Sequence, residues 1–306
     1  MRRRIYWRFA YHTLHDAPTQ EAFASEWLSG RGKEMAAFTI GSERHRELFC
    51  REFIDTHEAY DVAALPWPEL DTASLQRLRS LPFWEEAVST ERSTAAKVRA
   101  QALLETDPLI REAVALQGEE EARHSALLEA LLTRYQIPVK ARPAAPLPTD
   151  IEWAFLRTEY GECFDSFFAF GLFAVAKDSG LFPPALVDMF EPIVQEEARH
   201  ILFFVNWLAY RRARLPWWRK PKLISRCLTG MAAQAWSRIQ TARGMGDGGD
   251  FTLKGHEAIT VDIKPRTFLE LCLYENDRRL GVYDRGLLRP RLVPSLVRAL
   301  CRFLPK

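Results

Sequence analysis

One pentapeptide, Glu-Glu-Ala-Arg-His, occurs twice in this chain, as Glu120–His124 and as Glu196–His200. In each copy the second Glu and the His stand three residues apart. Residues three apart on an α-helix project from the same face, so each copy presents a carboxylate and an imidazole to one point. Each copy also lies within an apolar pattern of helical period. The repeat therefore predicts two helices that carry matching Glu and His side chains into a shared core.

The apolar pattern around each copy advances in steps of three and four residues. The first stripe is Ile110, Val114, Gln117, Glu121, His124, Leu128 and Leu131. The second stripe is Val187, Phe190, Val194, Glu197, His200, Phe204 and Trp207. Charged groups on a buried stripe are costly unless they are paired or bound to a metal, so we interpret the Glu-x-x-His pairs as metal ligands. We expect the remaining charged residues of each copy on a wetter face: Glu120, Arg123, Glu196 and Arg199.

Helical periodicity and its breaks predict an all-α protein in three parts. Residues 1–80 form an N-terminal helical extension, with one helix over 43–59 whose histidines, His45 among them, face solvent. Residues 83–212 form a four-helix bundle of two αα-hairpins, which a proline-rich linker separates. The four helices are expected over 83–105, 108–135, 149–177 and about 184–212, with the linker at 137–148. Residues 215–306 form a basic, helical C-terminal extension that packs on the bundle.

A di-metal site in such a bundle needs one further carboxylate from each of the other two helices. In an antiparallel hairpin, depth follows from the distance to the turn, and this count selects Glu91 and Glu162. Asp165 is the alternative to Glu162; if it is not a ligand, it suits a hydrogen bond to a metal-bound imidazole. Glu159 lies further from the turn. The predicted ligands are Glu91, Glu121, His124, Glu162, Glu197 and His200.

This donor set also indicates which metals to expect. Four carboxylates and two imidazoles give each metal one nitrogen and several oxygens, and carboxylates can shift between bridging and terminal modes. Such a set suits iron or manganese, whereas zinc or copper is less favoured in the absence of thiolates. The expected cofactor is two iron ions, with an iron and manganese pair as the alternative.

The two Glu-x-x-His motifs, together with Glu91 and Glu162, resemble those of the ferritin-like di-iron carboxylate superfamily. The resemblance covers residues 83–212 and implies a bundle whose two metals activate dioxygen or peroxide between the hairpins. Its members include iron oxidases, rubrerythrin-like peroxidases and oxygenases. This chain has no four-cysteine rubredoxin-like module, and Ile193 stands where arylamine N-oxygenases have a further His ligand.

Segments on both sides of the bundle favour a substrate pocket over the single bundle of a cage-forming ferritin. We therefore expect a di-iron oxygenase or oxidase that uses dioxygen to oxidise an organic, apolar substrate. The alternative is a ferroxidase or a rubrerythrin-like peroxidase in iron or oxidative-stress handling. The chain encodes no electron donor, so reductive turnover would need a separate ferredoxin or reductase.

The formal net charge of +2 over 306 residues gives no reason to expect a nucleic-acid partner. Five scattered cysteines form no C-x-x-C motif, which favours a reducing, cytoplasmic setting. Two basic stretches with aromatic or apolar residues, 217–220 and 292–303, suit an anionic membrane surface. Packing of their apolar side on the bundle is favoured over that peripheral contact. The sequence indicates no oligomeric state.

Overall fold

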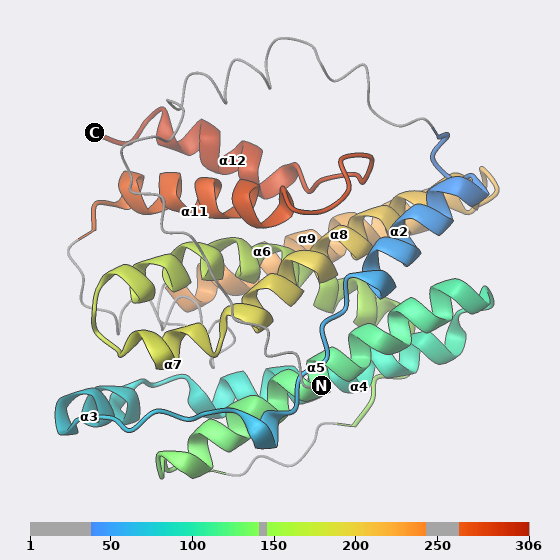
Figure 1. Cartoon of the computed structure of the whole chain (residues 1–306). Helices are drawn as coiled ribbons and strands as arrows, with labels where there is room; N and C mark the ends of the chain where they lie inside the picture. Colours follow the sequence, from blue (N-terminus) through green and yellow to red (C-terminus); the bar gives the residue numbers. More distant parts are fainter. Residues whose placement is uncertain (1–37, 141–145, 243–262, 306) are drawn as a thin grey trace. The chain divides into compact units, whose positions relative to one another are not determined.

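A computed structural model of the chain describes residues 38–140, 146–242 and 263–305. Over these ranges the regular structure is entirely helical, which confirms the predicted all-α class. Four long helices form two antiparallel pairs (Figure 1): α4 (Trp84–Leu104) with α5 (Pro108–Arg134), and α6 (Ile151–Asp178) with α8 (Glu191–Arg214). Contacts of α4 with α6, and of α5 with α8, join the two pairs around a shared interior.

The first hairpin turns at Asp107, as the sequence predicts. The Asp107 carboxylate accepts hydrogen bonds from the backbone N–H groups of Leu109 and Ile110, at 3.0 and 3.2 Å. Pro108 occupies the first helical turn, where its missing N–H leaves no bond unmade. The same carboxylate pairs with Arg46 of α2 (Glu43–Asp55) at 2.5 Å. One side chain thus starts α5 and fastens α2 to it.

The other end of α5 stops at a left-handed residue. Gln136 has φ 51°, and the N–H of Ile137 donates back to the carbonyl of Leu132 at 2.9 Å. This is the arrangement in which glycine is usually found, because a side chain is strained at positive φ.

The predicted single helix over about 184–212 is wrong. The structure has a short helix, α7 (Pro184–Asp188), followed by α8 from Glu191. Pro192 lies in the first turn of α8 and has no N–H to donate to the carbonyl of Asp188, so a continuous helix would lose a bond there. The break falls before the repeat and leaves its helical register intact.

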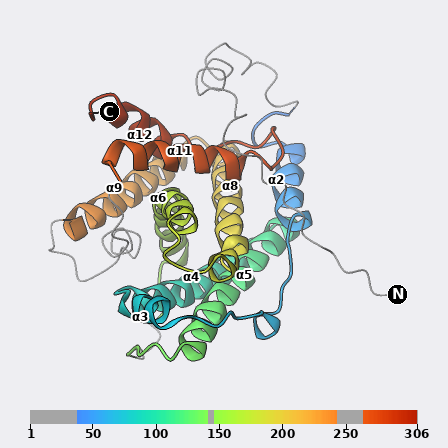
Figure 2. The same cartoon turned by 60° about the vertical axis from the view of Figure 1, so that its left-hand side comes forward.

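Further helices cover the outside of the two pairs (Figures 1 and 2). α2 lies against α5 and α8, and α9 (Lys220–Ala242) lies against α6. α11 (Pro265–Leu280) lies against α6 and α8, and α12 (Leu292–Cys301) packs on α11. Gly171 permits the close approach of α11, because a Cβ at this position would collide with the sulfur of Cys272.

The N-terminal extension is only partly described. The helix expected over 43–59 ends at Asp55, and it is followed by a 3-10 turn, η2 (Val62–Ala64), and by α3 (Thr72–Ser80). Residues 1–37 lie outside the described part of the chain, as do 243–262 of the C-terminal extension. The prediction for these segments is therefore untested.

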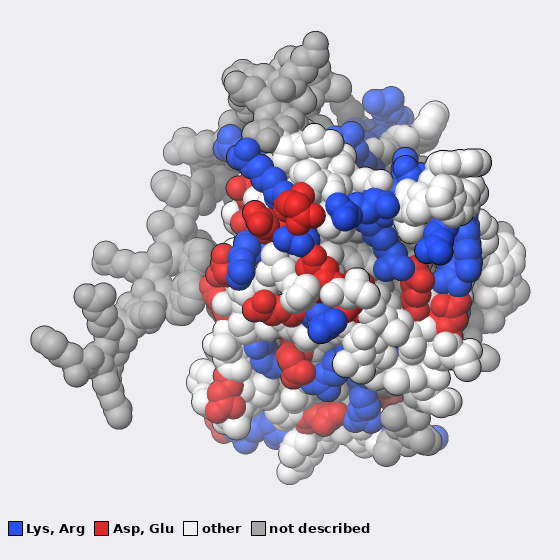
Figure 3. All heavy atoms as spheres, turned by 90° about the vertical axis from the view of Figure 1, so that its right-hand side faces the viewer, with Lys and Arg blue, Asp and Glu red and all other residues white. Residues whose placement is uncertain are grey.

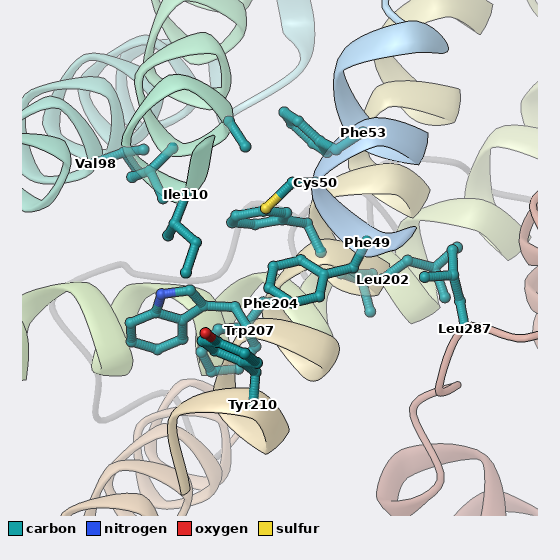
Figure 4. Close-up of a cluster of buried hydrophobic side chains, with 14 of the residues drawn as sticks. Phe49, Cys50, Phe53, Val98, Ile110, Leu202, Phe204, Trp207, Tyr210 and Leu287 are labelled. Atoms are coloured by element: carbon teal, nitrogen blue, oxygen red, sulfur yellow. The ribbon is translucent and has the colours of Figure 1, made fainter. Parts of the chain in front are cut away.

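The largest apolar core joins α2 to the bundle (Figure 4). It includes Phe49 and Phe53 of α2, Ile110 of α5, and Phe204 and Trp207 of α8. All five side chains are at least 96% buried. Full burial of a side chain of this size stabilises the fold by about 1.5–3 kcal/mol. This core fixes α2 over the junction of α5 and α8.

Acidic and basic side chains are interspersed on the face shown in Figure 3, in keeping with a net charge near zero. α12 buries Val293 and Val297 but leaves Leu292, Leu296 and Leu300 exposed. Trp217 and Trp218 of the other basic stretch are exposed as well, so the packing interpretation holds for only part of the 292–303 stretch and not for these two tryptophans. All five cysteines are free thiols. None of the described helices combines the length and apolar character needed to cross a bilayer.

Candidate metal centre

The two Glu-x-x-His pairs meet in the interior between the hairpins. Glu121 and His124 lie on α5, and Glu197 and His200 lie on α8. Both histidines are 0% exposed and Glu121 is 1% exposed. The side chain of Glu197 is 13% exposed and also lies near the Ser166 hydroxyl of α6, at 3.5 Å. The repeat therefore reaches the core, as its apolar flanks predict.

Each imidazole lies closest to the second Glu of the opposite copy. His200 Nδ1 is 3.0 Å from Glu121 Oε1, and His124 Nδ1 is 3.2 Å from Glu197 Oε1. Within each copy, the corresponding Nδ1 to carboxylate distance is 3.7 Å. The two copies thus match each other across the interior, with both carboxylates lying between the two rings.

Glu91 of α4 joins this group from the first hairpin. Its Oε2 lies 3.6 Å from His124 Nδ1, and its side chain is 16% exposed. One donor atom from each of Glu91, Glu121, His124 and Glu197 lies within 4.8 Å of the others. These four predicted residues form a cluster that could bind a metal ion.

Glu162 of α6 is not one of these four residues, but it lies near enough for the charges of Glu197 and Glu121 to act on it. Burial raises its pKa well above the usual range, and the negative charges of Glu197 and Glu121 raise it further. The charge of Asp165, one turn further along α6, has a smaller effect on the pKa of Glu162, and Asp165 is partly exposed. The choice between Glu162 and Asp165 as a ligand stays a prediction.

The cluster concentrates negative charge in a buried place. Burial raises the pKa of Glu91 to about 8. Burial lowers the pKa of a histidine, yet the surrounding carboxylates outweigh it and raise the pKa of both His124 and His200 well above the usual value. Carboxylates packed this closely need compensating cations, which are either protons or metal ions.

Unpaired donor atoms inside the cluster favour metal ions. His124 Nδ1, His200 Nδ1 and Glu121 Oε1 are buried and make no hydrogen bond. The 3.0 Å approach of His200 to Glu121 therefore lacks hydrogen-bond geometry. Buried polar atoms are rarely left unpaired, and bare imidazole nitrogens facing carboxylates are the donors that a transition metal uses. The residues present thus fit the predicted metals.

The first Glu of each copy is buried, so its prediction as a surface residue is wrong. Glu120 is 0% exposed and Glu196 is 5% exposed. The Nε2 of His200 lies 2.8 Å from Glu120 Oε2, and the Nε2 of His124 lies 2.7 Å from Glu196 Oε2. Each of these Glu residues therefore contacts the imidazole of the opposite copy at Nε2, the ring nitrogen that points away from the inner carboxylates.

The arginines of the repeat follow the same crossed pattern. Arg199 pairs with Glu120, and Arg123 pairs with Glu196. Their expected surface position is also wrong, since Arg199 is 3% exposed and the Arg123 side chain is 16% exposed. This face would be solvated on isolated hairpins, but here α5 and α8 turn it toward each other under α2. The sequence did contain a signal for the burial of these residues, because all five residues of the motif are duplicated and not only the Glu and His of the ligand pair.

This outer network fixes the tautomer of both imidazoles. A carboxylate behind Nε2 keeps the proton on that nitrogen, so a metal ion that displaced the other proton would bind at Nδ1, on the inward side of the ring. Glu120 and Glu196 are neutralised by Arg199 and Arg123, so the network adds no net charge to the inner cluster. It orients the histidines and leaves the charge of the inner carboxylates for a metal to balance.

α2 and the segment after it close the network on the outside. His57 Nδ1 pairs with Glu120, and the Arg123 guanidinium lies over the Tyr60 ring at 4.2 Å. The Arg199 guanidinium lies over the Phe53 ring at 4.8 Å. The prediction of solvated histidines is therefore wrong for His57, and also for His45, which is fully buried and contacts Asn206.

Comparisons with family models, with curated proteins and with solved structures give no match to this chain. The class of this protein is therefore described from its fold and its site alone. It is a helical protein with a buried cluster of Glu and His residues that could bind metal.

Proposed function

We propose that this chain is a ferritin-like di-iron protein that uses dioxygen to oxidise an organic, apolar substrate. Its two iron ions, or an iron and manganese pair, would be held by Glu91, Glu121, His124, Glu162, Glu197 and His200. When bound, these metals supply the redox chemistry with dioxygen. The observation that carries the proposal is the pair of unbonded, buried Nδ1 atoms, which face carboxylates from both hairpins.

The distances suggest which metal ion each residue would help to hold. Glu121 and Glu197 each approach both imidazoles within 3.7 Å, so they would help to hold the metal ions at both histidines. Glu91 lies near His124 and would help to hold the metal ion on that side. Glu162 is the proposed ligand from α6.

Charge balance supports two metal ions over one. The four proposed carboxylates carry four negative charges, and the imidazoles are neutral when Nδ1 is a ligand. Two divalent ions match that charge, whereas a single divalent ion would leave two buried carboxylates uncompensated. The outer Glu residues do not alter this balance, because arginines pair with them.

Two of the proposed carboxylate ligands are partly exposed to solvent. Glu91 and Glu197 keep 16% and 13% of their side chains exposed, whereas Glu121 and both histidines are closed to solvent. Dioxygen is therefore expected to enter beside Glu91 and Glu197. The apolar substrate and a separate reductase or ferredoxin belong to the proposal and are to be identified by assay.

The test measures the metal content and the oxidation of excess ferrous iron. Wild-type protein reconstituted anaerobically should bind two ferrous ions per chain, and a His124→Ala/His200→Ala variant should lose both. Glu119→Gln changes an exposed carboxylate on α5 and is the matched control. Trace metal in the wild type would overturn the proposal. Rapid oxidation of excess ferrous iron to a mineral would instead support the ferroxidase alternative.

A further inference from the structure

A further buried carboxylate lies beside the six proposed ligands. Glu159 is on α6, one helical turn before Glu162 and therefore on the same face of that helix. It is 1% exposed. Counting residues from the turn placed Glu159 too far from the site, yet it is more deeply buried than Glu162.

Only one oxygen of Glu159 has a partner. Gln117 Nε2 donates to Glu159 Oε1 at 2.8 Å, whereas Glu159 Oε2 is buried and makes no hydrogen bond. Gln117 is itself 0% exposed and lies one turn before Glu121 on α5. The Gln117–Glu159 pair therefore spans from α5 to α6, one turn along from the proposed ligands of these two helices.

The charged groups that act on Glu159 are residues of the proposed metal cluster. The charges that act on it are those of His200, Glu121 and Glu197. Burial, the largest effect, raises its pKa to about 8. A buried carboxylate oxygen without a partner is costly, and the amide of Gln117 offers a hydrogen bond but no positive charge.

The two sides of the cluster also differ in their ligands. His124 Nδ1 has Glu91 as a close third carboxylate, at 3.6 Å. Among the described residues, the carboxylates within 4.0 Å of His200 Nδ1 are those of Glu121 and Glu197. Glu162, the proposed ligand from α6, is not among them, so the His200 side has room for a second donor from that helix.

We propose that Glu159 is a fifth carboxylate ligand of the centre, with Oε2 as the donor atom to the metal ion held by His200. Gln117 then positions this carboxylate through Oε1. The negative charge of Glu159 is one more than two divalent ions balance, and the ammonium group of Lys97 on α4, whose charge acts on Glu162, supplies the remaining positive charge. The inference rests on the proposed di-metal function and extends its ligand set to seven residues. Its test must separate loss of one metal ion from absence of the whole centre.

Anaerobic titration with Co²⁺, followed by the visible absorption of the bound ion, gives this separation. The wild type should saturate at two equivalents. Glu159→Gln keeps the size of the side chain and a partner for Gln117, so we expect one tight equivalent and a second weakened at least tenfold. Glu119→Gln is the exposed control and should match the wild type. Gln117→Leu should weaken the same second equivalent by a smaller factor.

Two results would overturn the inference. If Glu159→Gln binds two equivalents with wild-type affinities, Glu159 is not a ligand, and the six-residue centre stands. If the wild type binds fewer than two, the proposed function fails together with the inference. Should Glu159→Gln not fold, Glu159→Asp replaces it, because the shorter carboxylate keeps the charge and withdraws Oε2. That variant should show the same loss of the second equivalent.

Discussion

Replacing Glu196 by Gln tests whether the outer network orients the metal ligands. The Glu196 carboxylate is 6% exposed, accepts a hydrogen bond from His124 Nε2 at 2.7 Å and pairs with Arg123. A hydrogen bond to a charged group is worth about 1.5–3 kcal/mol, and breaking a fully buried ion pair costs about 3–5 kcal/mol. Because Arg123 keeps 16% exposure, we expect a loss of about 2–4 kcal/mol in the free energy of unfolding.

The same substitution should weaken metal binding. Without a carboxylate behind Nε2, His124 is free to rotate or to change tautomer, and loss of such a partner typically reduces metal affinity about 10–100-fold. Urea denaturation of the metal-free protein measures the stability loss, and anaerobic Co²⁺ titration measures the affinity. A double-mutant cycle with Arg123→Met isolates the Glu196–Arg123 contribution.

Glu129→Gln provides the matched control. Glu129 lies on α5 and also pairs with an arginine, Arg92, but both side chains are nearly half exposed. Exposed pairs contribute about 0–1 kcal/mol, so stability should change little and metal affinity not at all. The reasoning is refuted if Glu196→Gln leaves metal affinity within twofold of the wild type, or if both variants lose the same stability.

Two further predictions concern the ends of α5. Asp107→Ala should cost about 1–2 kcal/mol in thermal or urea unfolding, because it removes the N-cap. Burial alone would raise the pKa of Asp107, but the N–H of Ile110 and the Arg46 guanidinium outweigh it and lower that pKa. The advantage of the wild type over Asp107→Asn should therefore be complete above pH ~4 and fade as pH falls through the lowered pKa; an advantage that grows in acid would contradict this. Gln136→Gly should raise the free energy of unfolding by about 0.5–1 kcal/mol, since glycine removes the strain at φ 51°. Unchanged or reduced stability would refute that assignment of strain.

The sequence predicts the all-α class and most helix ends because local chemistry determines them. Asp107 and Pro108 mark the start of α5, and the apolar stripe through Glu121 and His124 predicts which face is buried. Pro192 was equally visible, but the pattern on both sides of it continued in helical register and hid the break between α7 and α8.

The outer network could not be predicted from one helix at a time. Glu120 and Glu196 project about 100° away from their neighbouring ligands, onto what would be a solvated face of an isolated hairpin. Their burial follows from the contact of α5 with α8 and from the cover that α2 provides. The position of Glu159 close to the cluster was not predicted for a related reason. It depends on how far α6 is shifted along α5, and counting residues from the hairpin turn does not give that shift.

Crystals of the anaerobically iron-loaded protein, with anomalous diffraction measured at the iron absorption edge, would test the central claim most directly. We predict two anomalous peaks about 3.5–4 Å apart between α5 and α8, one bound by His124 Nδ1 and the other by His200 Nδ1. A single peak, or none among Glu91, Glu121, Glu162 and Glu197, would contradict the account.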